Sequence, residues 1–181
     1  MAGRVSKQAA GGSGIKEEGK FRQRVDDHYK VMAAAKKSIS TAGRLQLASA
    51  IGLGTVMGVA ATQPEAGSMA LIGVGLVLMI YSGVCSQGAT AAAGAKDAEK
   101  NATAYAGRLR TLALLLVLSA GGLAGAVSTE VLETPPTPLL IAFGGVGALD
   151  LIGCLLGLSS SSQLLGAFES QKAKREATKA N

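Results

Sequence analysis

Charge is scarce in this chain and is missing from long stretches of it. Only 17% of the 181 residues are charged, whereas 48% are hydrophobic. Four apolar runs stand out, at residues 45–62, 68–86, 111–129 and 139–159, and Asp150 is the single charged residue inside them. A helix needs about 20 apolar residues to cross a hydrocarbon core of roughly 30 Å. The runs are apolar on every side, which excludes the soluble bundle, whose helices each need a polar face.

Residues that carry out catalysis or bind metals are also few. The chain has one histidine, His28, and two cysteines, Cys85 and Cys154, which both fall inside apolar runs. A zinc site needs three or four ligands, and a serine nucleophile needs a neighbouring base. We therefore expect no catalytic residues, no metal and no other cofactor, so the chain is not expected to be an enzyme. The two cysteines are expected to be buried packing residues rather than a disulfide.

Lysine and arginine are absent from two of the loops between these runs. The loop at residues 63–65 and the loop at residues 130–138 contain none, whereas all 18 lie in residues 1–44, 96–110 and 172–179. Basic residues beside membrane spans stay on the cytoplasmic side. Both termini and the central loop are therefore predicted to be cytoplasmic. The net charge of +6 fits this distribution, so nucleic acid is not an expected partner.

The sequence predicts an all-α polytopic membrane protein, a bundle of four transmembrane helices built from two antiparallel hairpins. This transmembrane domain covers residues 45–162. Residues 1–20 are low in apolar content and are expected to be flexible. Residues 163–181 are expected to form a cytoplasmic helix and tail, with basic residues at Lys172, Lys174, Arg175 and Lys179.

Residues 21–44 show the pattern of an amphipathic juxtamembrane helix. Apolar residues recur at spacings of three and four, from Phe21 through Met32 to Ile39. Such a helix either lies along the anionic membrane surface or stays in solvent, and the sequence does not decide between these. Its other faces carry the basic residues Arg22, Arg24, Lys30, Lys36 and Lys37.

Small residues are expected to hold the membrane helices together. Lipid gives apolar helices no hydrophobic reason to associate, so close backbone approach at glycine supplies much of the packing. Such faces can join helices within the bundle or bind other membrane proteins, and the spacing leaves both open. Glycines four residues apart occur in three of the runs: Gly54 and Gly58, Gly121 and Gly125, and Gly153 and Gly157.

Asp150 is the polar exception in the fourth run. A carboxylate near the middle of a span costs about 2.5 to 3.5 kcal/mol on insertion scales and is a candidate for function, such as an ion site or proton relay. No basic residue and no second carboxylate lies in any of the runs. This favours a structural role, in which the carboxyl group is hydrogen-bonded to Thr55, Ser82 or Ser119.

The ends of the chain resemble the Jagunal family of endoplasmic-reticulum membrane proteins. The resemblance rests on Arg24-Val25 and His28-Tyr29 with basic residues before the first span, and on residues 162–165 with Phe168 and a lysine-rich tail. It implies a role in organising the reticulum and in early vesicle trafficking, with vesicle-coat proteins as partners of the tail. Two alternatives remain: an accessory subunit of a larger, organellar or other, membrane complex, and a small transporter or proton channel that uses Asp150.

Overall fold

The computed structural model describes residues 12–62, 66–94, 96–129 and 134–180, and the side chains of residues 26–62, 67–94, 96–129 and 134–177. Every secondary-structure element in these ranges is an α-helix. The four helices are α1 (Gly12–Ala60), α2 (Ala66–Ala93), α3 (Ala98–Ser128) and α4 (Thr137–Ala180). Gln63, Pro64, Glu65, Glu130 and Glu133 lie outside the described residues.

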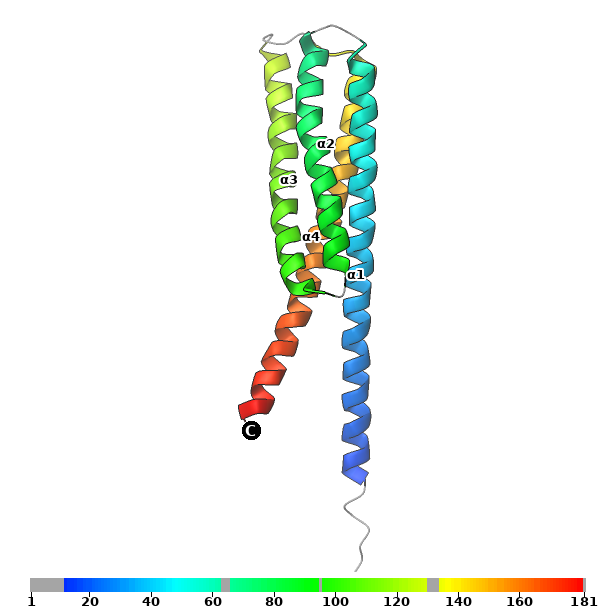
Figure 1. Ribbon diagram of the computed structural model, residues 1–181, viewed down its shortest axis with the longest axis vertical. Helices are drawn as coiled ribbons and strands as arrows, with labels where there is room; N and C mark the ends of the chain where they lie inside the picture. Colours follow the sequence, from blue (N-terminus) through cyan, green and yellow to red (C-terminus); the bar gives the residue numbers. More distant parts are fainter. Residues whose placement is uncertain (1–11, 63–65, 95, 130–133, 181) are drawn as a thin grey trace, which may run out of the picture.

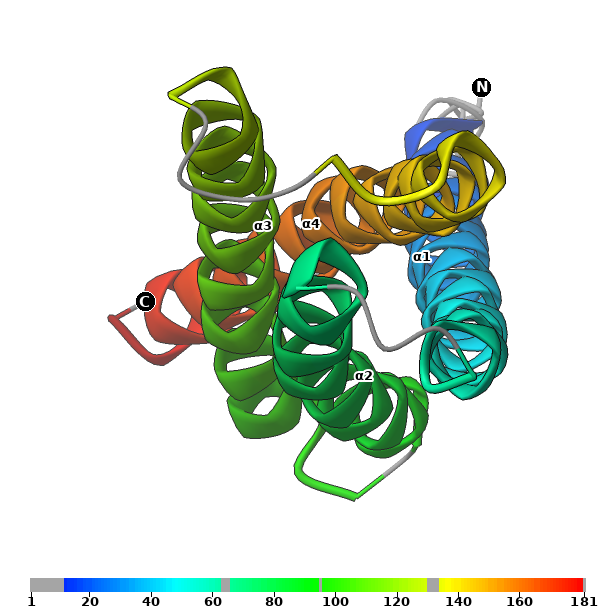
Figure 2. The same ribbon diagram turned by 90° about the horizontal axis from the view of Figure 1, so that it is seen from above.

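The helices pack side by side as an up-and-down arrangement (Figures 1 and 2). Helices α1 and α3 run in one direction, and α2 and α4 run in the other. Extensive contacts join α1 to α2, α2 to α3, α3 to α4, and α4 back to α1. Consecutive helices are therefore antiparallel neighbours, and α1 and α4 close the ring.

Three of these helices are long and apolar enough to cross a membrane: Gly67–Ala93, Ala98–Ser128 and Thr137–Ala177. The fourth helix, α1, is not among them, because its apolar second half continues directly from a charged first half. The chain is thus an integral membrane protein by the composition of α2, α3 and α4.

Two turns show why the helices begin where they do. Before α3, Asp97 has a left-handed backbone with φ of 52°, and the Asn101 side-chain amide donates to the carbonyl oxygens of Ala91 and Lys96 at 3.3 and 3.2 Å. These bonds close the α2–α3 turn with an asparagine side chain. Before α4, the Pro136 carbonyl accepts from the backbone of Leu139 and starts the helix.

The buried core forms two groups along the bundle. The larger group includes Ile39, Leu78, Tyr105, Leu109 and Leu164 and draws on all four helices. A smaller group of Val56, Ala60, Leu71 and Leu139 lies where α1 ends and α4 begins. Hydrophobic burial therefore involves all four helices in the larger group, and α1, α2 and α4 in the smaller one.

The juxtamembrane part of α1 differs from both interpretations of its pattern. Helix α1 is continuous from Gly12 and starts inside the segment expected to be flexible, since residues 15–40 are rich in strong helix formers. Its apolar stripe packs into the protein, with Ala35 and Ile39 fully buried. The stripe therefore contacts neither lipid nor solvent at these positions. Helix α4 continues without a break to Ala180, through the segment expected to form a cytoplasmic helix and then a tail.

Candidate functional site

Asp150 points into the bundle and is fully buried. The hydroxyl Oγ of Ser82, also fully buried, donates a 2.5 Å hydrogen bond to Asp150 Oδ2 and so joins α2 to α4. The other oxygen, Oδ1, has no hydrogen-bond partner among the described residues. Of the other hydroxyls expected near Asp150, Thr55 donates to the Ile51 carbonyl of its own helix, and Ser119 lines a groove described below.

A second buried hydrogen bond lies next to this pair and was missed from the sequence. The Tyr105 hydroxyl on α3 donates to Oε1 of Gln46 on α1 at 3.3 Å, and both side chains are fully buried. Tyr105 precedes the third apolar run and lies in residues 96–110, which carry the central group of basic residues. The sequence does contain one indication of a buried polar contact here, because Gln46 is a long polar residue in an otherwise apolar run.

Together these residues form one inner polar cluster that all four helices contribute to. Cys85 and Cys154 are buried and free, and both lie close enough to Asp150 to interact with it electrostatically. No cation of the described part of the chain interacts with the Asp150 carboxyl group. We define the inner polar cluster as Gln46, Ser49, Ser82, Cys85, Tyr105, Asp150 and Cys154.

The structure separates the predicted packing glycines into internal and outward-facing ones. A Cβ atom added at Gly153 would lie 3.3 Å from Gln46 Cγ, and one added at Gly157 would lie 2.7 Å from Leu109 Cδ1. Gly54 is in ordinary contact with Met79. An added Cβ would meet no described atom within 4 Å at Gly58, Gly121 and Gly125.

Further close approaches, those of Gly43, Gly52 and Gly75 among them, were not expected from the four-residue spacing. Gly43 packs on Ala89, where an added Cβ would be only 2.6 Å from the alanine Cβ. Gly75 packs on Met57 and Gly52 on Val146. Whether a glycine contacts a neighbouring helix therefore depends on the helix face it occupies and not on the four-residue spacing alone.

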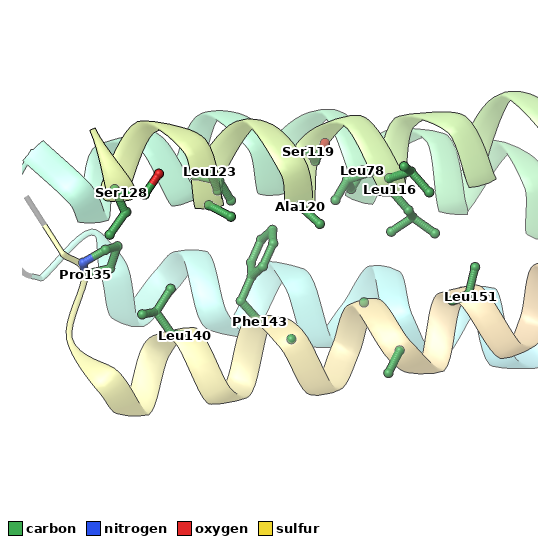
Figure 3. Close-up of a pocket in the computed structure, with 16 residues that line it drawn as sticks. Leu78, Leu116, Ser119, Ala120, Leu123, Ser128, Pro135, Leu140, Phe143 and Leu151 are labelled. Atoms are coloured by element: carbon green, nitrogen blue, oxygen red, sulfur yellow. The ribbon is translucent and has the colours of Figure 1, made fainter. Parts of the chain in front are cut away.

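An apolar groove opens between α3 and α4 at the end where α3 finishes (Figure 3). Its volume is about 560 Å³, and Phe143 points from α4 across it toward α3. The groove is lined mainly by small and aliphatic side chains, among them Ser119, Ala120, Ala124, Gly144, Gly147 and Ala148. Its chemistry suits an apolar surface and offers almost no hydrogen-bonding groups.

The predicted basic residues do not form one site. Lys36 donates from Nζ to the Gly94 carbonyl at 3.1 Å, so it joins α1 to the end of α2. Lys30 pairs with Asp27 at 3.8 Å on the exposed side of α1, and Lys37 is exposed. The side chains of Arg22 and Arg24 lie outside the described residues.

The basic residues of the tail lie far from those of α1. Lys172, Lys174 and Arg175 are exposed on the last turns of α4, which leans away from α1 beyond the bundle (Figure 1). The Lys179 side chain lies outside the described residues.

Comparison with known proteins gives no relative for this arrangement. No family model matches the chain, and neither a curated protein nor a solved structure is similar to it.

Proposed function

We propose that this chain is a four-span, non-enzymatic membrane protein that serves as an accessory subunit of a larger membrane complex. In this role α3 binds a membrane-spanning helix of the partner. The observation that carries the proposal is the exposure of α3: only 6% of its most apolar stretch is buried inside the protein, against 33% for α2. Within the bundle, α3 therefore leaves most of its surface for other contacts.

The second half of α1 supplies the fourth span in this proposal. Residues 45–60 contain no charged side chain, and they pack along α2 and α4 through Gly52 and Gly54. This part of α1 runs antiparallel to α2 and α4 and packs against both, so it lies at the same depth in the membrane as they do. The absence of basic residues from residues 63–65 and 130–138 then supports cytoplasmic termini.

The composition of the outward side of α3 favours a helix over lipid. Gly121, Gly122 and Gly125 have open space where a Cβ would be, so another backbone can approach there closely. The groove between α3 and α4 continues this surface with further small residues. Lipid chains need only an apolar surface, whereas helix pairs in membranes are enriched in small residues.

Photo-crosslinking in native membranes tests this surface. A photoreactive residue at Leu118, which is 64% exposed beside these glycines, is expected to crosslink one discrete protein. The matched control is Ile51 on α1, which is 65% exposed and whose outward face carries one open glycine, Gly58, instead of three. Gly121→Leu is expected to abolish the Leu118 product. Crosslinking to lipid alone, to a second copy of this chain, or equally from both positions would contradict the accessory role.

A second candidate is the role that the Jagunal resemblance implies, reticulum organisation and early vesicle trafficking. The helical extensions of α1 and α4 favour it, because both leave the bundle at the same end (Figure 1) and expose charged residues there. Vesicle-coat proteins would bind the basic end of α4. Imaging of the tagged chain with organelle markers tests this: a location outside the reticulum would exclude it and leave the accessory role.

A further inference from the structure

Three polar atoms of the inner polar cluster lack a hydrogen-bond partner among the described residues. They are Asp150 Oδ1, Ser49 Oγ and Gln46 Nε2, and all three residues are fully buried. An unpaired buried polar group costs about 1–3 kcal/mol. Three such groups on adjoining turns of α1 and α4 point to a shared partner such as a buried water.

The register of α1 against α4 brings these residues to the same place. Gly52 lies beside Val146, and Gln46 lies beside Gly153. The two helices are antiparallel, so Ser49, midway between Gly52 and Gln46, falls opposite Asp150. Gln46 follows one turn closer to the end where α1 begins.

The three free atoms are complementary in kind. Gln46 Nε2 is a donor, Asp150 Oδ1 accepts, and the Ser49 hydroxyl can do either. One water molecule can accept from the amide, donate to the carboxyl group and bond the hydroxyl, which is the usual number of bonds for a buried water. A metal cation fits less well, because the amide N–H group would repel it.

Buried polar groups follow Asp150 closely in one direction, whereas apolar side chains separate it from Ser68 in the other. Toward the end where α1 begins and α4 finishes lie Tyr105, Cys154 and Ser161, and the buried Ser161 Oγ has no partner in the described part of the chain. In the other direction the core is formed by Leu53, Val56, Leu71 and Leu78 with Val146. Buried polar groups therefore lie between Asp150 and one end of the bundle, and apolar side chains lie between it and the other.

We propose that Asp150 is a proton-binding site, reached through a water held between Asp150, Ser49 and Gln46, and open only toward the end where α1 begins. In the step, hydronium delivers a proton to the carboxylate Oδ1, which leaves a neutral carboxylic acid and a water molecule. The Ser82 hydrogen bond to Oδ2 is kept in both states. This one-sided access distinguishes the site from a channel, which needs a second exit, and it does not depend on the proposed partner of α3.

The groups that face the carboxyl group from each helix allow this exchange. Helix α1 presents Gln46 and Ser49, which do not titrate, α2 presents Cys85, α3 presents Tyr105, and α4 presents Cys154. Arg108 is the one basic side chain of the described residues that interacts with the cluster, through Cys85. None of these groups is a cation in contact with the carboxyl group, so none competes with a proton at Oδ1.

Infrared spectroscopy of the full chain in lipid nanodiscs tests the proposal. The C=O stretch of a protonated carboxyl group should be present and should be lost in Asp150→Asn, which keeps the shape and the Ser82 bond. On transfer to D2O the band shifts as the proton exchanges. Tyr105→Phe removes a hydroxyl on the open side and is expected to slow this exchange about tenfold, the effect of losing roughly one hydrogen bond.

The matched control is Ser68→Ala, which removes a buried hydroxyl with no described partner at the other end of the bundle. Exchange in this variant is expected to stay unchanged. If Tyr105→Phe does not fold, Ser161→Ala takes its place. The proposal is overturned by the absence of an Asp150-dependent band in acidic buffer, by unchanged exchange in the open-side variants, or by slowing in Ser68→Ala.

Discussion

Ser82 on α2 and Asp150 on α4 are joined by a hydrogen bond of 2.5 Å in the fully buried centre of the bundle. The two helices are parallel and not consecutive, so this bond fixes a contact that no connecting loop enforces. Hydrogen bonds between membrane helices contribute about 0.6 kcal/mol on average and at most about 1.7. We expect the contribution of the Ser82–Asp150 bond to lie near this upper limit, because both side chains are removed from water and lipid.

A double-mutant cycle of Ser82→Ala and Asp150→Ala measures this bond. Each single change leaves one buried partner unpaired, so the two losses in free energy of unfolding should overlap. The expected coupling is about 1–2 kcal/mol, measured by reversible unfolding in mixed detergent and lipid. Simple addition of the two single losses would show that the bond contributes nothing to stability.

Gly43→Ala should be among the most damaging glycine substitutions, although Gly43 lies outside the predicted spans. The new Cβ would lie 2.6 Å from Ala89 Cβ, and an alanine side chain cannot rotate away. Relief requires α1 and α2 to separate, which should cost about 1–3 kcal/mol of unfolding free energy. Gly125→Ala is the matched control, because its Cβ meets nothing within 4 Å. Equal stability of the two variants would argue against this α1–α2 packing.

The side of each terminus decides between three and four spans. If α1 crosses the membrane with α2, α3 and α4, tags at both ends should be reached after selective permeabilisation of the plasma membrane. A tag inserted at residue 132 should stay protected. Since only α2, α3 and α4 are apolar enough by composition alone, termini on opposite sides would show that α1 does not span.

Asp97 should be replaceable by glycine but not by valine. Its φ of 52° lies in the left-handed region, which costs most residues about 1–2 kcal/mol and costs glycine nothing. Asp97→Gly is therefore expected to keep or raise the thermal stability, and Asp97→Val to lower it by roughly that amount. A stable valine variant would mean that the α2–α3 turn adopts another backbone conformation.

Much of the architecture follows from the apolar runs. The four runs fall within helices apart from their last residues Ala61, Thr62 and Thr129, because an uncharged run of this length has few alternatives to a buried or membrane helix. The extent of α1 and α4 was less predictable. Their charged ends could have been flexible or surface-bound, and only packing against α2 and α4 shows that Ala35 and Ile39 are core residues.

The sequence by itself determined that the chain is helical and belongs to a membrane, since composition sets the solvent in which each segment is stable. It also marked Asp150 as unusual. Only the tertiary structure decided that Ser82 is its partner and that Gln46 and Tyr105 share the same interior. It also decided which glycines face a neighbour. These facts depend on helix rotation and register, which arise from contacts among all four helices rather than from any one segment.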